Sequence, residues 1–442
     1  MKRWVPRVAL ILCLTGCAHG SAVLHQATTP PVSPVPAGQI RGTIWAGAAR
    51  VEITPPVGTP LAGYARRRGR PSRGVHDPLY ARALALSDGE HVVVLVSAEI
   101  LIIDQPLYEA ALARIEERYR VGREGFLLWA THTHSGSGAY GQCFLEQRSM
   151  GRYDQRVFDA LSRAIAEAAI RAVEVLAPAA ISGGETTVEG ASWNRVVDGG
   201  PTDPFVRVLR VDHRTGQPLA RLVTFAAHPT VLSAANRDFS GDYPGVLMRA
   251  VETKQPGSVC LFAAGAIGDQ APVYGAEDRF TESQRLGERL AAAALEAVTE
   301  KAAVTDGRIK TVVEDLPLPD AHLRVGRLRL PSWLSRRFVE SRTPLHLVAV
   351  DRWLLIGAPC DLGVEVAAEI AGAAHARGRH PIFIGFAEDY IGYVLPATAY
   401  ASNTYEARMH FYGPRIADTL TRAVIAMMDT LTPVEEHATT TR

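Results

Sequence analysis

The 442-residue sequence contains only five cysteines and almost no net charge. No two cysteines are spaced as Cys-x-x-Cys, which disfavours both a disulfide scaffold and a cysteine-bound zinc site. The formal charge is +1 with no long run of either sign, so a nucleic-acid partner bound through a basic face is not expected. Hydrophobic residues make up 47% and charged residues 21%, a composition typical of a globular chain rather than a disordered one.

The N-terminus has the layout of a secretory signal. A positively charged start precedes the apolar run 8–14, which is too short to span a bilayer. Leu-Thr-Gly-Cys at 14–17 then resembles a bacterial lipobox, which predicts a signal peptide over 1–16 and lipidation of Cys17. A simple signal or an uncleaved anchor is the alternative. Ala18 favours the outer membrane, so we expect an exported lipoprotein held on a membrane, facing the periplasm or the exterior.

The rest of the chain divides into three parts. Residues 17–40 are rich in Pro, Thr and Ser and predict a tether that need not fold. No Pro- or Ser-rich break interrupts 41–432, which we expect to be one catalytic-sized domain, and 433–442 is expected to be a disordered tail.

Strand-like and helix-like stretches alternate through that domain. The strands expected at 81–86 and 91–96 flank Asp-Gly-Glu at 88–90, a hairpin signal. Further strands are expected at 205–211, 222–227, 259–263 and 381–386, with 346–356 either a strand pair or one bent strand. Helices are expected at 107–119, 153–175, 282–298, 364–376 and 416–428. This order predicts an α/β fold with a mixed sheet or sheets flanked by helices.

Histidines follow two of the apolar runs. His132 and His134 come after Leu-Trp-Ala, and on a strand two residues so spaced would point to the same side. His228 ends the run 222–227. Three imidazoles at strand exits favour a zinc site, although a pair of hydrogen-bonded surface histidines would give the same His-x-His pattern.

A catalytic zinc site of this kind would also need a carboxylate. Asp242, Asp269 and Asp361 each follow a strand or lie in a loop near one. Asp361 and Asp242 could equally be N-caps of the helices that follow them. The spacing does not choose among the three.

Several short blocks run in order from about residue 48 to 431: Ala-Arg-Val-Glu-Ile-Thr-Pro-Pro (49–56), Leu-Tyr-Ala-Arg-Ala (79–83), Thr-His-Thr-His-Ser-Gly (131–136), Asn-Arg (194–195), Ala-His-Pro-Thr (227–230), Ser-Gly-Asp (240–242), Gly-Asp-Gln-Ala-Pro (268–272), Tyr-Ile-Gly-Tyr (390–393), Tyr-Glu-Ala (405–407) and Tyr-Gly-Pro (412–414). Together they resemble the neutral/alkaline ceramidase family, zinc amidohydrolases that cleave the amide of N-acylsphingosine. Their number and order carry the resemblance, since no single block is decisive.

The resemblance implies a zinc ion bound by His132, His228, Asp361 and Tyr393, with Tyr390 the alternative to Tyr393. Asp361 stands where the family commonly has glutamate, and a carboxylate shorter by one methylene can still bind zinc if the backbone lies closer.

The resemblance also implies that His134, Arg195 and Tyr405 line the substrate pocket. His134 would lie near the amide, and Tyr405 would hydrogen-bond the reacting group. The family's ceramide-cleaving members carry a serine where this chain has Ala271. Because a methyl group cannot act as a nucleophile, attack would have to come from zinc-activated water.

These features predict a zinc-dependent hydrolase that cleaves the amide of N-acylsphingosine or of another small-molecule or lipid N-acyl compound. The chain also stops near the end of the family's catalytic domain, so we expect no C-terminal β-sandwich. Two alternatives remain at this stage: a non-catalytic ligand-binding lipoprotein, and a zinc esterase on the same scaffold.

Overall fold

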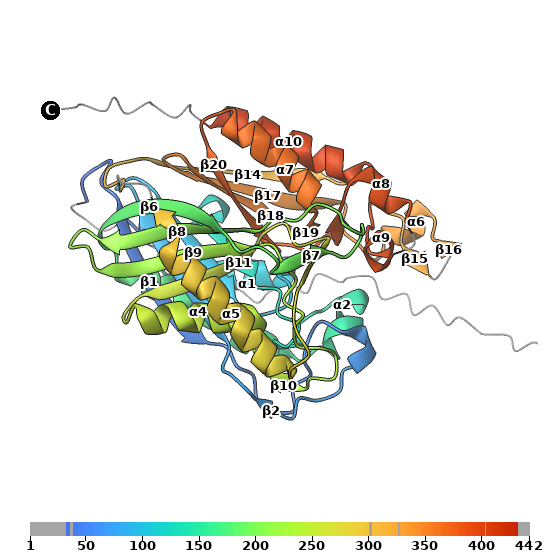
Figure 1. The fold of residues 1–442 in the computed structure, drawn as a ribbon. Helices are drawn as coiled ribbons and strands as arrows, with labels where there is room; N and C mark the ends of the chain where they lie inside the picture. Colours follow the sequence, from blue (N-terminus) through green and yellow to red (C-terminus); the bar gives the residue numbers. More distant parts are fainter. Residues whose placement is uncertain (1–31, 36–38, 300–302, 326–327, 403, 432–442) are drawn as a thin grey trace, which may run out of the picture.

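The computed structural model describes residues 32–35, 39–299, 303–325, 328–402 and 404–431. Its largest feature is a nine-stranded mixed sheet, shown in Figure 1. The strand order is β11 (Val259–Ala264), β9 (Pro218–Phe225), β8 (Phe205–His213), β6 (Ala177–Thr187), β1 (Trp45–Glu52), β3 (Tyr80–Ser87), β4 (Val92–Ala98) and β5 (Phe126–Ala130), with β13 (Val298–Thr299) paired to β6. The two outermost pairs, β11–β9 and β4–β5, are parallel, and the other neighbours are antiparallel.

A second sheet of four strands lies against the first. Its order is β14 (Ile309–Pro317), β17 (Arg342–Val350), β18 (Trp353–Ala358) and β20 (His380–Gly385). Side chains from both sheets share one apolar core, in which Leu95 and Trp129 of the large sheet meet residues such as Leu355 of the small one. The molecule is therefore built on two packed sheets.

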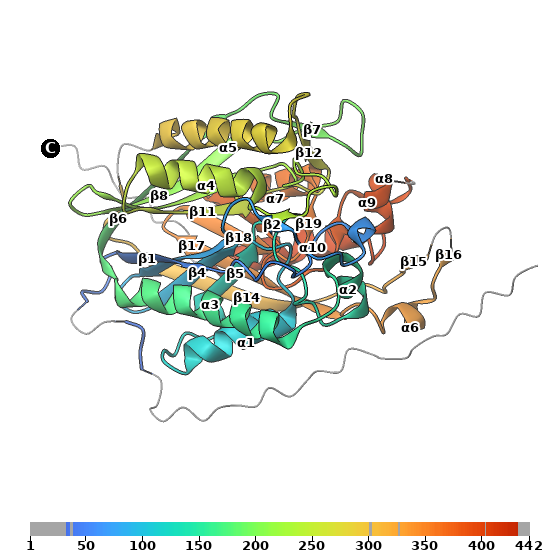
Figure 2. The ribbon, with the colours of Figure 1, turned by 90° about the horizontal axis from the view of Figure 1, so that it is seen from below.

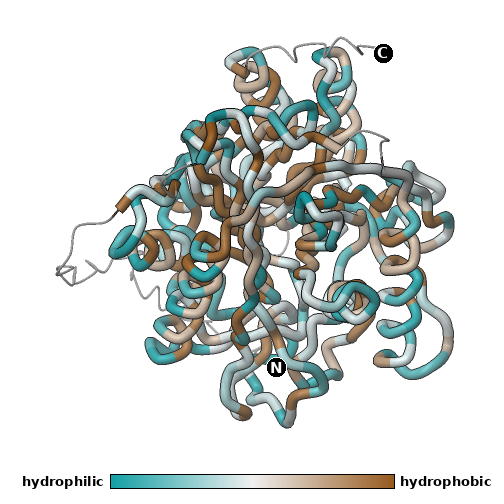
Figure 3. Tube along the Cα trace, turned by 90° about the vertical axis from the view of Figure 1, so that its left-hand side faces the viewer, coloured by the Kyte–Doolittle hydropathy of each residue, from teal (hydrophilic) through white to brown (hydrophobic). Residues whose placement is uncertain are grey.

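Helices cover the outer face of each sheet, as Figures 1 and 2 show. The large sheet packs against α1 (Gln105–Glu116), α3 (Gln155–Glu174), α4 (Asp242–Lys254) and α5 (Arg279–Glu296). The small sheet packs against α7 (Val364–His375) and α10 (Ile416–Thr430). In Figure 3 the hydrophobic colour gathers along the central strands, whereas the outlying helices and loops carry more of the hydrophilic colour.

The strand sequences explain this layering. In β4, Val92, Val94 and Val96 face the helix-covered core, and Val93 and Leu95 face the core between the sheets. Successive side chains of a strand point to opposite faces, so a strand buried on both faces has an unbroken apolar run.

The remaining elements of the fold are short. The two-residue and three-residue strand pairs are β2 (Gly74–Val75) with β10 (Asp238–Phe239), β7 (Ser192–Asn194) with β12 (Gln270–Pro272), β15 (Arg324–Val325) with β16 (Leu328–Arg329), and β19 (Asp361–Leu362) with β21 (Tyr393–Val394). The short helices are η1 (Ala65–Arg67), η2 (Arg123–Gly125), α2 (Phe144–Met150), α6 (Ser332–Ser335), α8 (Ala397–Tyr400) and α9 (Tyr405–Arg408).

The structure confirms the α/β fold class, the 88–90 hairpin and each expected helix to within a few residues at its ends. The stretch 346–356 belongs to two antiparallel strands, β17 and β18. No helix within the described residues is long and apolar enough to cross a membrane. No disulfide joins Cys143, Cys260 and Cys360 to one another.

The N-terminal predictions fall largely outside the described residues. The signal peptide 1–16, Cys17 and the tail 433–442 all lie there. Part of the expected tether is described and lies against the domain: the Val32 amide donates to the Arg118 carbonyl at 3.0 Å, and the Arg120 amide donates to the Val32 carbonyl at 2.9 Å. The backbone of this stretch therefore has partners in the domain.

Candidate metal centre

His132 and His134 lie just beyond β5, and our strand explanation for their shared direction is wrong. The strand ends at Ala130, and His132 takes a left-handed backbone conformation with φ of 64°. The rings converge because the chain turns there: the two Nε2 atoms are 3.2 Å apart. A non-glycine residue rarely adopts this conformation, and such strain is commonly found at functional sites.

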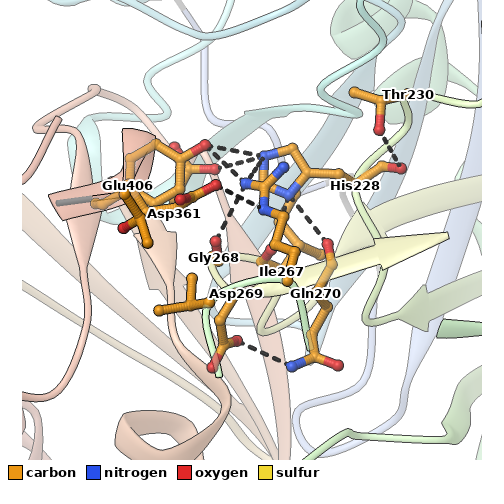
Figure 4. Close-up of polar contacts among 12 residues, drawn as sticks. His228, Thr230, Ile267, Gly268, Asp269, Gln270, Asp361 and Glu406 are labelled. Carbon is orange, nitrogen blue, oxygen red and sulfur yellow. Dashed lines mark hydrogen bonds and ion pairs between the residues drawn. The ribbon is translucent and has the colours of Figure 1, made fainter. Parts of the chain in front are cut away.

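Hydrogen bonds fix the ring orientation of two of the histidines. The Nδ1 atom of His132 lies 2.7 Å from the Leu101 carbonyl, and the ring stacks on Phe386 with centroids 3.8 Å apart. The Nδ1 atom of His228 lies 2.8 Å from the Ile267 carbonyl, as Figure 4 shows. Each Nδ1 therefore carries the proton, and each Nε2 presents a lone pair to the site.

Asp361 approaches the Nε2 atoms of His132 and His228 from the small-sheet side of the fold. It lies in β19, where it is the register partner of Tyr393 in β21. The N-cap of α7 is Gly363, so the expectation that Asp361 could be a helix cap is wrong. The Asp361 Oδ1 atom lies 3.0 Å from His228 Nε2 and 3.9 Å from His132 Nε2.

The donor set fits a divalent transition metal. Ligand atoms of His132, His134 and His228 all lie within 4.8 Å of one another. Asp361 is fully buried, and its Oδ1 atom has no hydrogen-bond partner among the described residues. A buried carboxylate oxygen facing imidazole lone pairs is costly without a cation, and two imidazoles with one carboxylate are ligands that zinc accepts.

His134 differs from the other two histidines. Its Nδ1 atom is buried and has no recorded partner within the described part of the chain. A metal-bound histidine usually donates its second ring N–H to a carbonyl or carboxylate. Asp361 therefore fits the third ligand position better than His134, although the nitrogen atoms alone would form a three-histidine group.

Burial dominates the electrostatics of the cluster. It lowers the pKa of His132 to about 3, and it lowers the pKa of His228 and of His134 well below the usual value. The next contribution to the lowered pKa comes from Arg195 for His228 and from His132 for His134. Burial also raises the pKa of Asp361, against the opposing effect of His132. All three imidazoles are consequently neutral at pH 7 and can act as ligands or bases.

Two tyrosines contact this centre in different ways. The Tyr390 hydroxyl donates to Asp361 Oδ2 at 2.7 Å and so orients the carboxylate. The Tyr393 hydroxyl lies 3.3 Å from His228 Nε2. The sequence left open whether Tyr390 or Tyr393 would bind the metal. Of the two, Tyr393 is the one whose hydroxyl oxygen lies next to an imidazole nitrogen of the cluster.

Arg195 brings a positive charge to the centre. It follows β7, and its Nη2 atom lies 2.9 Å from the Tyr393 hydroxyl and 3.1 Å from His228 Nε2. Glu406 pairs with its Nε atom at 3.0 Å. Although burial opposes the charged form, Tyr393 and Glu406 raise the pKa of Arg195. Sequence reasoning missed Glu406, despite its place in the Tyr-Glu-Ala block.

Tyr405 forms the outer edge of the site. Its side chain is 54% exposed, and its ring centroid is 6.1 Å from that of Tyr393. Tyr405 is therefore open to solvent on this side, while burial raises the pKa of its hydroxyl.

The remaining candidates have structural partners. Asp269 accepts the Val364 amide and the Asn194 side chain, and so ties β7 to α7. Asp242 is the first residue of α4, whose N-cap is Gly241, so it is not the cap we considered. Ala271 lies in β12 opposite Trp193, next to Gln270, whose carbonyl accepts the His228 amide.

Comparison with known sequences identifies one family. The sequence signature described as neutral/alkaline non-lysosomal ceramidase, N-terminal, matches residues 45–277, more than half of the chain. The neutral ceramidase of Mycobacterium tuberculosis is 23% identical over 456 residues, which cover 80% of this chain and 71% of that protein. The neutral ceramidase of Pseudomonas aeruginosa is 23% identical over 438 residues, 77% of this chain and 65% of that protein.

The fold has solved counterparts. The crystal structure of neutral ceramidase from Pseudomonas aeruginosa superposes with a TM-score of 0.80 at 22% identity, covering 90% of this chain and 76% of that one. A structure described as ceramidase complexed with C2 gives a TM-score of 0.78 at 21% identity, with coverage of 90% and 77%. At such identities the superposition establishes a shared fold.

Proposed function

The chain belongs to the neutral/alkaline non-lysosomal ceramidase family, and from that premise we propose that it is a zinc-dependent amidohydrolase acting on an N-acyl lipid such as N-acylsphingosine. One observation carries the proposal: the buried Asp361 Oδ1 atom, without a hydrogen-bond donor in the described structure, faces the Nε2 atoms of His132 and His228.

We assign the metal to His132, His228 and Asp361, with the Tyr393 hydroxyl as a fourth oxygen. The Leu101 and Ile267 carbonyls hold the two rings, and Tyr390 holds the carboxylate. When bound, zinc would supply a Lewis acid for the amide carbonyl and lower the pKa of a water molecule to about 7.

His134 is the group that moves the proton. Its Nε2 atom lies 3.2 Å from His132 Nε2, beside the proposed ligands, and the neutral imidazole can accept a proton from the attacking water. The same atom can then pass the proton to the departing amine nitrogen, which is otherwise a poor leaving group.

Arg195 and Tyr405 provide positive charge and a hydroxyl donor where the carbonyl oxygen gains negative charge. The ion pair with Glu406 keeps the guanidinium in place, and the exposed Tyr405 side chain can adjust to a bound substrate. Donors aimed at that oxygen stabilise the transition state more than the ground state. Ala271 has no hydroxyl, so water is the nucleophile in this scheme.

The test compares His132→Ala with His134→Ala. We expect His132→Ala to lose both zinc and amide turnover, and His134→Ala to keep zinc while turnover falls by about a hundredfold or more. Metal analysis and turnover of a short-chain N-acyl amide are the measurements. If both variants lose zinc equally, the three histidines are the ligands; if His132→Ala keeps full zinc and full turnover, the proposal fails. Turnover of the ester that matches this amide, measured in parallel, distinguishes an amidase from an esterase.

We further propose that the chain is an exported lipoprotein acylated at Cys17, held on the outer membrane. The support is the charged start, the apolar run 8–14 and the Leu-Thr-Gly-Cys at 14–17. Mass spectrometry should show acyl chains on Cys17 of the membrane-extracted parent chain, and high salt should wash Cys17→Ser, but not the parent chain, from the membrane. An unacylated Cys17 contradicts the assignment.

A further inference from the structure

One surface next to the metal centre carries an unusual density of arginine. The ten residues 64–73 include five arginines and no acidic residue. Four of the arginines have exposed side chains: Arg66, Arg68, Arg70 and Arg73. For Arg66, Arg68 and Arg70, no carboxylate partner is recorded among the described residues, so their charge is not neutralised within the domain.

Exposed apolar side chains lie beside these arginines. Helix α2 contacts η1, and the Gly63 amide donates to the Ser149 carbonyl of α2 at 3.1 Å. Phe144 and Leu145 in the first turn of α2 are 62% and 36% exposed, and Arg148 follows in the same helix. We call Arg66, Arg68, Arg70, Phe144, Leu145 and Arg148 the η1–α2 face.

The η1–α2 face borders the catalytic cluster. Arg67, buried under this face, donates to the His134 carbonyl, and the Tyr64 ring lies 4.8 Å from the His134 ring. Figures 1 and 2 both place α2 on the side of the molecule that carries α9, and α9 begins with Tyr405 at the outer edge of the site. Helix α6, with Trp333 68% exposed, lies on the same side.

From this combination we infer that the η1–α2 face binds the surface of an anionic lipid bilayer. Guanidinium groups bind lipid phosphates with paired hydrogen bonds, while Phe144 and Leu145 can enter the boundary between headgroups and acyl chains. Each exposed arginine near an anionic bilayer contributes about 1 kcal/mol, or about fivefold in affinity. Nucleic acid would satisfy the arginines but would leave the two adjacent apolar side chains in water.

Docking through this face would bring the Tyr405 edge of the site toward the membrane. A lipid amide could then reach the metal centre without crossing bulk water. This consequence rests on the proposed function, whereas the binding itself does not, since it depends only on charge and exposed apolar surface.

The experiment measures sedimentation with vesicles of phosphatidylcholine, alone or mixed with phosphatidylglycerol. The protein is a chain that begins at Ala18, which keeps every described residue and lacks the proposed lipidation site. We expect binding to the mixed vesicles, weaker binding at high salt and little binding to phosphatidylcholine alone.

Two double variants test the two components of the η1–α2 face, its arginine charge and its exposed apolar side chains. Arg68→Glu with Arg70→Glu should weaken binding by about 25-fold or more. Phe144→Ser with Leu145→Ser should weaken binding by about tenfold, and this loss should persist at high salt. The matched control is Val175→Ser with Arg308→Gln, which changes exposed side chains near the starts of β6 and β14, off the η1–α2 face, and should bind like the parent chain.

Equal vesicle binding by the parent and the charge-reversed chain overturns the inference. So does equal binding to neutral and anionic vesicles, or binding to DNA without binding to vesicles. Turnover of a soluble short-chain amide is measured in parallel and should be the same in all variants, because none of the changed residues touches the metal cluster. If no chain hydrolyses the amide, the proposed function fails while the vesicle result still decides the docking surface.

Discussion

Gly63 lies directly against the His134 ring. Its φ is +110°, and a Cβ atom built there would lie 2.7 Å from two atoms of the His134 ring. Since His134 has no hydrogen bond at Nδ1 to hold it within the described structure, a side chain at position 63 would displace the ring. A displacement of about 1 Å can reduce turnover by about a hundredfold.

We therefore expect Gly63→Ala to retain zinc and to lose about a hundredfold in turnover. The control is Gly58→Ala, where φ is +104° and nothing lies within 4 Å of the added Cβ. Both variants bear the same kind of backbone strain, but only one meets His134. Similar losses of turnover in the two variants would show that strain, rather than the ring contact, is responsible.

Asp242 gives the fold a pH dependence that is separate from the metal centre. Burial raises the pKa of this carboxyl to about 6, against the opposing hydrogen bonds from the Leu232 and Tyr243 amides. The folded state therefore keeps a proton on Asp242 that the unfolded state releases near pH 4. The contribution of this proton to the free energy of unfolding is complete below pH 4 and is lost as the pH rises to about 6.

The matching variant is Asp242→Asn, which cannot titrate and suits the left-handed φ of 54° at this position. Between pH 4 and pH 6.5, the free energy of unfolding of the parent should fall by about 2 to 3 kcal/mol relative to the variant. Urea unfolding of both chains across this range measures the difference, in which shared titrations cancel. A constant difference would mean that Asp242 stays ionised in the fold.

At the residue scale, sequence reasoning selected the side chains of the proposed metal site through their types and through the family blocks. It could not give the reason for their convergence. His132 and His134 meet through a left-handed turn rather than strand alternation, and such a conformation leaves no local pattern in a non-glycine residue. The pairing of Asp361 with Tyr393 depends on two-residue strands that have no periodicity to detect.

At the scale of elements, the strained loop after β20 packs against the proposed metal site. Phe386 and Glu388 both have positive φ, and this loop carries the ring that stacks on His132. Glu388 Oε1 lies 2.6 Å from Nδ1 of the buried His346 in β17. Left-handed residues cost about 1 to 3 kcal/mol each, so the pair with His346 helps to hold the loop in this conformation.

We expect His346→Leu to destabilise the fold by about 3 kcal/mol or more, because it leaves the Glu388 carboxylate buried without its partner. The variant should also bind zinc more weakly, because the same loop carries Phe386, whose ring stacks on His132. The double variant His346→Leu with Glu388→Leu removes the unpaired group and should recover part of the stability. Unfolding in urea and zinc affinity are the measurements. A double variant no more stable than the single one would contradict this account of the pair.

The sequence patterns identified most of the long elements, because apolar runs and helical spacing are local properties. The β17–β18 hairpin was ambiguous for a physical reason. Its turn is Asp351-Arg352 without glycine, and Asp351 itself takes the left-handed conformation with φ of 51°. Aspartate tolerates that conformation better than most residues, but it is a weaker turn signal than glycine.

At the scale of the whole molecule, the proposed metal ligands join the two packed sheets. His132 and His228 follow strands of the large sheet, whereas Asp361 and Tyr393 belong to the short pair next to the small sheet. The two sheets also share an apolar core, so each half should remain folded when the metal is absent. Metal loss should therefore loosen the contact between β19–β21 and the histidine loops without unfolding either sheet.

Removing the metal with a chelator should lower the melting temperature by several degrees, since a metal present at about a thousand times its Kd contributes about 4 kcal/mol. Hydrogen exchange should rise at residues 361–362 and 393–394 and in the loop around His132, and should stay unchanged in the core strand β4. His134→Ala should respond to the chelator like the parent, because its metal ligands are intact, whereas Asp361→Asn should melt at the lower temperature with or without the chelator. Equal melting temperatures of the chelated and the zinc-loaded parent would show that no metal couples the two sheets.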